Sequence, residues 1–392
     1  NWENPRARAS VYDMMRWWLN KGIDGFRMDV INMISKAPGL PDAPVTTADR
    51  YQNGERHYIH GPRLMEFLSE MKQQVLSSYD LLTVGETPRV NTRQAIELTD
   101  EGTGSLRMVF QFEHMALGGI TFDAAGQPAL RGYSLADLKQ IMNRWQVDLA
   151  ERGWNSNYLS NHDHPRQVSA FGDGGAYRVQ SAKMLGTLIH LLRGTPYVYQ
   201  GEEIGMTNVA FDSIDETRDI SARNMWHEFV DQKGLDPRRT LAVLRARGRD
   251  NARTPMQWDA SSQAGFTTGT PWIKVNPNYP AINVAQAQAD SDSIFRYYQR
   301  LIHLRHAHPA IVLGGYQPVL PDQPQVYAFT RALGDERLLV ILNLSGDTPV
   351  FEWPAGLPHA YAELLIANYE VDAARDRAAI PLRPYEARVY RI

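Results

Sequence analysis

The sequence has no cysteine among its 392 residues, so disulfide bonds and thiolate metal sites are excluded. A reducing compartment suits such a chain, and we predict a cytoplasmic location. The sequence also lacks any apolar run of the roughly 18 residues that a membrane-spanning helix needs. Its first residues do not resemble a signal peptide. Together these absences predict a soluble protein with no membrane partner.

An excess of charge of one sign is also missing. The 41 Lys and Arg residues nearly balance the 44 Asp and Glu residues, and no basic stripe offers a surface for nucleic acid. A neutral small molecule is therefore the expected partner, whereas the oligomeric state has no signal in the sequence. Nine Trp and eighteen Tyr are compatible with sugar binding, because pyranose faces stack on aromatic rings, although most such residues belong to a core.

Helices and short apolar strands alternate along the first half of the chain. A helical pattern at 11–19 precedes a strand at 23–28, and the same order returns with a helix at 64–75 and a strand at 81–84. This alternation favours the α/β class, with a parallel sheet covered by helices and a functional site at the carboxyl ends of the strands. Further strands are predicted at 108–112, 156–159 and 196–199, and further helices at 179–192 and from Ile294 to Ile302.

Five strands are three too few for a closed (β/α)₈ TIM barrel. We therefore interpret residues 1–315 as the C-terminal portion of such a barrel, strands 4 to 8, with a long insertion at about 203–283. A hairpin around Gly334-Asp335 begins a small antiparallel all-β domain, a β-sandwich at 316–392. A barrel open at two edges would expose apolar surface, so we expect the chain to be a fragment of a longer protein.

A first acidic strand end is formed by Gly25-Phe26-Arg27-Met28-Asp29. Residues two apart in a strand share a face, so Arg27 would keep Asp29 ionised and oriented, as a carboxylate nucleophile requires. A structural ion pair explains the same two residues, and the motif alone does not separate the two interpretations.

A second carboxylate, Glu86, stands at the end of the apolar strand predicted at 81–84. A partly dry setting would raise its pKa, as a general acid requires, although a single glutamate at a strand end is also a common loop anchor.

A third acidic strand end is formed by Asn161-His162-Asp163-His164. In a strand, an aspartate points to the face opposite the two histidines that flank it, so the three side chains cannot easily converge and we predict no metal site here. Three acidic strand ends in one barrel suit glycoside hydrolysis, in which one acid attacks, one protonates the leaving oxygen and one stabilises the oxocarbenium-like transition state.

With these motifs the chain resembles glycoside hydrolase family 13, the α-amylase family, and its oligo-1,6-glucosidase and dextran glucosidase branch. The segment 25–32 is similar to the family's nucleophile motif, Val84-Gly85-Glu86 to its acid/base motif, and 159–163 to its stabiliser motif. The resemblance continues through 110–114 and 249–258 to the final β domain.

The resemblance implies a role for each matching residue. Asp29 would be the nucleophile, Glu86 the acid/base, and Asp163 the stabiliser that binds the 2- and 3-hydroxyls of the sugar. Arg27 and His162 would assist, and Arg249 would reach the terminal 4-hydroxyl and favour attack from the non-reducing end. A structural ion pair with Asp250 or another acid explains Arg249 equally well. A retaining mechanism further predicts carboxyl groups of Asp29 and Glu86 about 5–5.5 Å apart.

One position is expected to determine whether α-1,6 or α-1,4 linkages are cleaved. In similar enzymes Val after the nucleophile accompanies α-1,6 cleavage, whereas Ala or Thr accompanies α-1,4 cleavage, and here the residue is Val30. A β-branched side chain would crowd the 1,4 linkage by about 1–3 kcal/mol, although core packing is an alternative use. The predicted function is thus a retaining, exo-acting α-glucosidase that hydrolyses α-1,6 bonds of small isomalto-oligosaccharides.

Alternatives remain open at this stage. A trehalose-6-phosphate hydrolase, a broad α-1,4-glucosidase and a sucrose isomerase share parts of the pattern, and an inactive fragment or a non-catalytic homologue belongs to a different class. The family's first conserved region, its inserted domain and its calcium loop would all lie before residue 1. No cofactor is therefore predicted from these residues.

Overall fold

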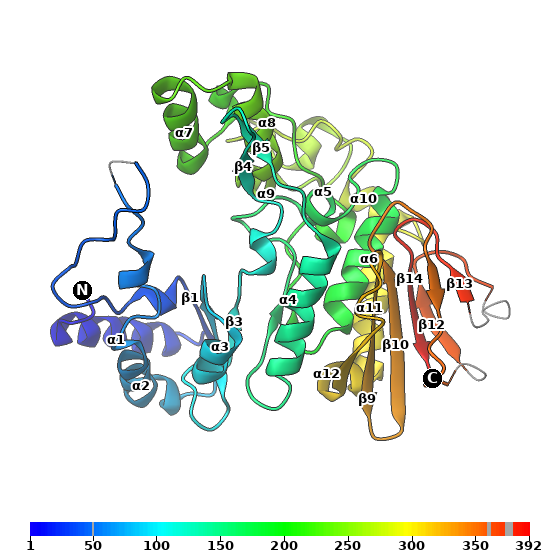
Figure 1. Cartoon of the computed structure of the whole chain (residues 1–392), viewed down its shortest axis with the longest axis horizontal. Helices are drawn as coiled ribbons and strands as arrows, with labels where there is room; N and C mark the ends of the chain where they lie inside the picture. The colour runs from blue at the N-terminus through cyan, green and yellow to red at the C-terminus, as the bar shows by residue number, and fades with distance from the viewer. Residues whose placement is uncertain (49–50, 359–361, 373–378) are drawn as a thin grey trace. The chain divides into compact units, whose positions relative to one another are not determined.

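The computed structural model describes residues 1–48, 51–358, 362–372 and 379–392 (Figure 1). The chain divides into two compact units. One is formed by Asn1–His114 and Arg144–Ser156, and the other by Met115–Asn143 and Asn157–Ile392. This division does not follow the predicted domain boundary after residue 315, which stays a prediction.

The first unit is built on a parallel three-stranded sheet in the order β1-β2-β3. Each predicted strand is present within two residues of its expected ends. The strands are β1 (Gly25–Met28), β2 (Leu82–Glu86) and β3 (Met108–Phe110), and the helices are α1 (Pro5–Leu19), α2 (Leu64–Gln74) and α3 (Thr92–Thr99). The unit therefore repeats the predicted order of helix and strand.

Helix α1 begins at a capping signal that the sequence carries. The Asn4 side chain accepts the backbone N–H of Arg6 at 2.9 Å, and Pro5 occupies the first turn. The helix buries Tyr12, Met15 and Leu19, whereas Met14 and Trp18, which the helical pattern placed on the buried face, are exposed. That expectation was wrong, because both side chains lie about a quarter turn or more from the centre of the buried stripe.

The second unit contains short strand pairs, helices and a larger sheet. Strand β6 (Ser156–Asn157) pairs with β7 (Thr195–Pro196), and both are shorter than the predicted strands at 156–159 and 196–199. Strand β6 and helix α4 (Leu135–Asp148) span the boundary between the two units. The other elements before the larger sheet are β4 (Ile120–Phe122), β5 (Pro128–Leu130), α5 (Gln167–Phe171), α6 (Arg178–Leu191), α7 (Ile220–Trp226), α8 (Pro237–Arg247), α9 (Asp250–Arg253), α10 (Val284–Ala289), α11 (Ile294–Ala307) and α12 (Pro309–Leu313).

The region predicted as a long insertion, about 203–283, is folded. It holds helices α7, α8 and α9 and a π-helix at His227–Gln232. Helix α8 starts at Asp236, whose carboxylate accepts the N–H groups of Arg238 and Arg239. The predicted insertion thus contains helices with their own capping residues.

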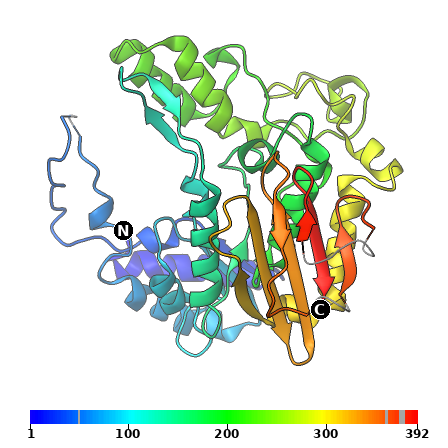
Figure 2. The ribbon, with the colours of Figure 1, turned by 45° about the vertical axis from the view of Figure 1, so that its right-hand side comes forward.

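The C-terminal part of the second unit is an antiparallel five-stranded sheet in the order β12-β14-β10-β9-β8 (Figure 2). The predicted hairpin is confirmed, since Gly334-Asp335 joins β9 to β10 and Gly334 adopts the left-handed φ of 57° that a tight turn favours. The strands are β8 (Gly315–Val319), β9 (Val326–Leu333), β10 (Glu336–Asn343), β12 (Glu363–Ala367) and β14 (Ala387–Arg391), and a separate pair is formed by β11 (Val350–Glu352) and β13 (Ala379–Pro381).

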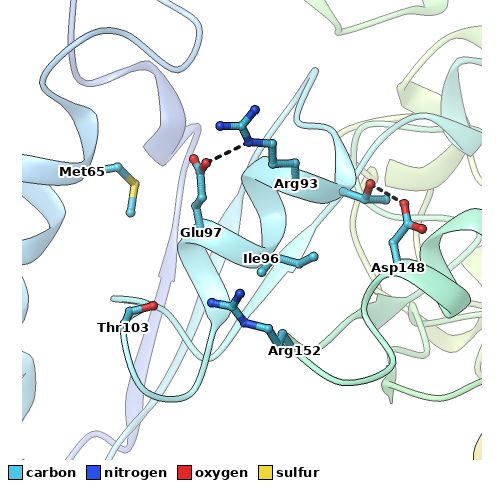
Figure 3. A pocket seen from close by; sticks show the side chains of 8 residues that line it. Met65, Arg93, Ile96, Glu97, Thr103, Asp148 and Arg152 are labelled. Atoms are coloured by element: carbon cyan, nitrogen blue, oxygen red, sulfur yellow. Dashed lines mark hydrogen bonds and ion pairs between the residues drawn. The ribbon is translucent and has the colours of Figure 1, made fainter.

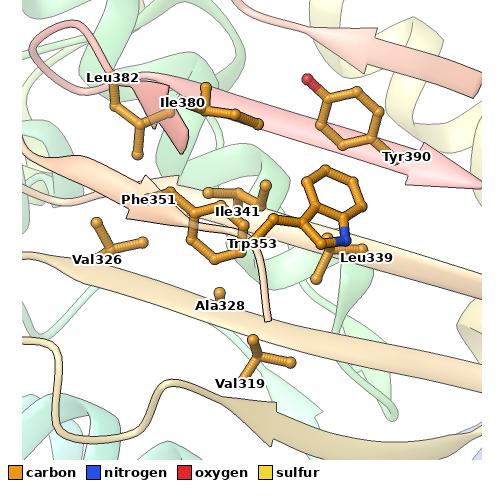
Figure 4. Packing of buried hydrophobic residues seen from close by; sticks show 10 residues of the cluster. All are labelled: Val319, Val326, Ala328, Leu339, Ile341, Phe351, Trp353, Ile380, Leu382 and Tyr390. Atoms are coloured by element: carbon orange, nitrogen blue, oxygen red, sulfur yellow. The ribbon is translucent and has the colours of Figure 1, made fainter. Parts of the chain in front are cut away.

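Both faces of β10 are buried, which explains its continuous apolar run. Leu339 and Ile341 pack into a cluster with Phe351, Trp353 and other buried residues from β8, β9, β13 and β14 (Figure 4). Leu338 and the other alternate residues face helices α6 and α12, which contact the same strand. One face of β10 therefore packs into the β-strand cluster, and the other packs against helices α6 and α12 of the same unit. Within the described part of the chain, no helix is long and apolar enough to cross a membrane.

Candidate active site

One arginine joins the two acids predicted to carry the chemistry in the first unit. Arg27 lies in β1, Asp29 follows the strand, and Glu86 ends the neighbouring β2. The Arg27 guanidinium donates through Nη1 to Asp29 Oδ1 and through Nη2 to Glu86 Oε2, the second bond at 2.5 Å. The parallel pairing of β1 with β2 therefore gathers the two acids at one sheet edge, as the sequence predicted.

The environments of these two acids differ. The Asp29 side chain is 75% exposed, whereas that of Glu86 is 11% exposed. Burial raises the pKa of Glu86, and a hydrogen bond with Asp29 raises it further, against the opposing effects of the Arg27 charge and the Val30 N–H. The pKa thus moves in the direction that a general acid requires. The predicted separation of about 5–5.5 Å between the carboxyl groups stays a prediction.

Val30 adopts an unusual backbone conformation. Its φ of 36° and ψ of 41° lie in the left-handed region, which a β-branched residue rarely enters. Its N–H points to Glu86 Oε2 at 3.3 Å. Strain of this kind costs on the order of 1–3 kcal/mol and is typical of functional segments. The position predicted to set linkage preference is therefore also held close to Glu86.

In the second unit Asp163 is held by two arginines. Arg249 Nη1 lies 3.2 Å and Arg253 Nη2 lies 2.5 Å from Asp163 Oδ1. Arg253 also donates through Nε to the carbonyl oxygen of His162 at 2.9 Å, and the His162 ring nitrogen lies 3.5 Å from Asp163 Oδ2. The predicted residues His162, Asp163 and Arg249 are thus brought together, and Arg253 joins them.

Arg249 forms a strong structural ion pair, one of the two interpretations that the sequence left open. Its partner is Asp219, at 2.6 Å from Nη2, and not the adjacent Asp250. Burial acts to raise the pKa of Asp219, but the hydrogen bonds from Arg249 and the Ser221 N–H outweigh it and hold the pKa below its usual range. The Asp250 carboxylate instead accepts the backbone N–H groups of Arg218 and Asp219. A role of Arg249 at the sugar 4-hydroxyl stays a prediction.

The reason given for excluding a metal at 161–164 was wrong, because these residues form a turn and not a strand. Asn161 caps the turn with its side-chain oxygen, which accepts the Asp163 N–H at 2.8 Å and lies 2.9 Å from His164 Nδ1. Burial lowers the pKa of His164 to about 4. Among the described residues, no group of three or more His, Asp or Glu side chains gathers as metal ligands would. The expectation of no metal stays a prediction.

The first unit also contains a cavity of about 630 Å³ (Figure 3). Its charged groups are already paired, since Arg93 contacts Glu97, Thr92 donates to Asp148 at 2.6 Å, and Arg152 contacts Asp100. It is lined by Met65, Thr92, Arg93, Ile96, Glu97, Thr103, Asp148 and Arg152, and by none of the predicted site residues. We therefore assign it no part in catalysis.

Comparison with known proteins identifies the family of this chain. Residues 1–314 match the model of the α-amylase catalytic domain, and residues 326–389 match the C-terminal domain of the α-amylase SusG. The chain belongs to the α-amylase family, glycoside hydrolase family 13. The predicted family and its fold class, the C-terminal part of a (β/α)₈ TIM barrel followed by a small antiparallel β domain, are thereby confirmed.

Individual relatives within glycoside hydrolase family 13 match the whole chain. It is 56% identical to an oligo-1,6-glucosidase of Parageobacillus thermoglucosidasius and 50% identical to one of Bacillus cereus, covering 69% of each protein. The solved structure of the Bacillus licheniformis trehalose-6-phosphate hydrolase is 43% identical, with a TM-score of 0.90 over the whole chain and 69% of that protein. By their names, these relatives are enzymes that hydrolyse sugars, which is the class of activity predicted from the sequence.

Proposed function

We propose that this member of glycoside hydrolase family 13 is a retaining, exo-acting α-glucosidase that hydrolyses the α-1,6 bonds of small isomalto-oligosaccharides. The observation that carries the proposal is the shared guanidinium of Arg27, which binds an exposed Asp29 and a buried Glu86 whose pKa is raised. Retaining glycosidases need this pairing of a carboxylate nucleophile with a protonated acid. The oligo-1,6-glucosidases at 56% and 50% identity support the linkage.

The proposed reaction has two steps. The Asp29 carboxylate attacks the anomeric carbon while Glu86 transfers its proton to the glycosidic oxygen, so the C–O bond breaks and a glucosyl ester forms. Glu86, now ionised, takes a proton from water, which attacks the same carbon and releases glucose with its configuration retained. Asp163 is assigned the stabiliser role that its motif carries in the family, and Arg249 and Arg253 hold its carboxylate in place.

No step of this chemistry requires a cofactor, and we propose none. The partner is a small oligosaccharide, and we propose no nucleic acid or membrane partner. The absence of cysteine supports a cytoplasmic location.

The test is the release of glucose from isomaltose, maltose and trehalose 6-phosphate, measured in parallel with the same protein. We expect kcat/KM to be highest for isomaltose. Trehalose-6-phosphate hydrolase is the second candidate, because the solved relative at 43% identity carries that activity in its name. A preference for trehalose 6-phosphate would overturn the α-1,6 assignment, and a preference for maltose would indicate an α-1,4-glucosidase.

Linkage preference is expected to change in the variant Val30→Ala. Removing the branched side chain at this strained position relieves crowding of the 1,4 linkage, so the ratio of kcat/KM for maltose to that for isomaltose should rise about tenfold or more. The control is Val75→Ala, which truncates a fully buried valine of the same unit outside the site. An unchanged ratio in Val30→Ala would contradict a role of this side chain in linkage choice.

A further inference from the structure

Glu202 is a buried carboxyl group to which the proposed chemistry gives no role. It begins a 3₁₀-helical turn at Glu202–Ile204, in the segment that follows β7, and it is 2% exposed. Its Oε1 accepts the hydroxyl of Ser160, itself 3% exposed. Its Oε2 is buried without a hydrogen-bond partner among the described residues. A charged carboxylate with an unpaired buried oxygen would be costly.

The surroundings of Glu202 favour its neutral form. Burial raises the pKa of Glu202 to about 8, and the charge of Glu203 adds to the shift, while the Ser160 hydroxyl, a backbone hydrogen bond with Tyr199 and the charge of Arg166 act in the opposite direction. Arg166 forms no ion pair with it among the described contacts, because its Nη1 and Nε bind the carbonyl oxygens of Gln200 and Asn251. Tyr298 faces Glu202 from α11, and burial together with the charge of Glu202 raises the pKa of this tyrosine.

Ser160 connects this carboxyl group to Asp163. It stands three residues before Asp163, at the start of the turn that Asn161 caps. Arg249 and Arg253 bind the Asp163 carboxylate, and Arg253 also donates to the carbonyl oxygen of His162, so these contacts hold the turn at its Asp163 end. The hydrogen bond from Ser160 to Glu202 connects the Ser160 end of the turn to the segment after β7. Strand β7 in turn pairs with β6, the strand that precedes the turn.

We propose that Glu202 is a positioning residue for Asp163: by holding the Ser160 hydroxyl, it fixes the turn that carries Asp163. This inference rests on the proposed role of Asp163 in catalysis. A displacement of a catalytic group by about 1 Å can cost about 100-fold in rate. A turn held at only one end therefore lowers the rate of the chemical step more than it lowers substrate binding.

The test compares Ser160→Ala and Glu202→Leu with the control Ser156→Ala. Ser156 is a buried serine of β6 whose hydroxyl has no hydrogen-bond partner among the described residues. Both test variants are expected to lose about 10- to 100-fold in kcat for isomaltose with a much smaller change in KM. The double variant should lose no more than either single variant, since each removes the same bond. Glu202→Gln retains a neutral side chain with an acceptor oxygen, and should lose far less than Glu202→Leu.

A second readout does not depend on activity. Backbone amide exchange of a peptide covering residues 159–166 should be faster in Ser160→Ala and Glu202→Leu than in the unaltered protein, and unchanged in Ser156→Ala. If Ser160→Ala matches Ser156→Ala in both kcat and exchange, Glu202 does not position Asp163. If the unaltered protein releases no glucose from isomaltose, the proposed function fails, and the exchange rates still decide whether Glu202 holds the turn.

Discussion

Replacing Asp29 with asparagine is expected to lower kcat for isomaltose by about 10⁴-fold or more, because an amide oxygen cannot form the glucosyl ester. Folding should be nearly unaffected. The Asp29 side chain is 75% exposed, and an exposed ion pair contributes about 0–1 kcal/mol. Arg27 also retains its bond to Glu86 in this variant. The loss should therefore appear in steady-state kinetics of a protein whose thermal unfolding midpoint hardly changes.

Covalent labelling distinguishes a nucleophile from an acid that only supports the site. A fluorinated glucoside that forms a slowly hydrolysed ester should add one sugar mass to the Asp29 peptide of the unaltered protein, and to no peptide of Asp29→Asn. The control Asp24→Asn changes an aspartate just before β1 and should retain both activity and labelling. Labelling of another residue would show that the nucleophile was assigned wrongly.

The acids of the site were predictable because the signal is local. Asp29 and Glu86 each follow a short apolar run, and parallel strands bring such residues to one sheet edge. The strand pattern therefore predicted the contact of Arg27 with Asp29 without knowledge of the loops, whereas the contact of Arg27 with Glu86 was not predicted. Where the pattern was extended too far, as in the strand predicted at 156–159, the actual turn was set by a side-chain cap from Asn161.

Other contacts had little or no signal in the sequence. Arg253 lies four residues after Arg249, a spacing that places both side chains on one helical face, and this could have suggested a joint contact. The partner of Arg249 was less accessible, since Asp219 stands 30 residues before it and Asp250 is adjacent. The bond between Ser160 and Glu202 joins residues 42 apart after two different strands, and only the fold brings them together.

Replacing Glu86 with glutamine is expected to slow isomaltose hydrolysis by about 10²- to 10⁴-fold, the range for loss of a general acid. The loss should depend on the leaving group. Sugar alkoxides need the proton, whereas fluoride and nitrophenolate do not, so formation of the glucosyl ester from α-glucosyl fluoride should be nearly unaffected. Azide, a nucleophile that needs no base, should accelerate turnover and yield α-glucosyl azide, with configuration retained.

The pH dependence of activity is a second test of Glu86 as the general acid. Glu86 must be protonated for the first step, and burial and the hydrogen bond with Asp29 raise its pKa, so the unaltered protein stays active to a higher pH than an ordinary glutamate would allow. Activity then falls as pH rises through that pKa, and this alkaline limb should disappear in Glu86→Gln. The control Glu113→Gln removes another carboxylate of the same unit that is paired with an arginine, Arg144, and should retain the limb. An alkaline limb that persists in Glu86→Gln would assign the acid to a different residue.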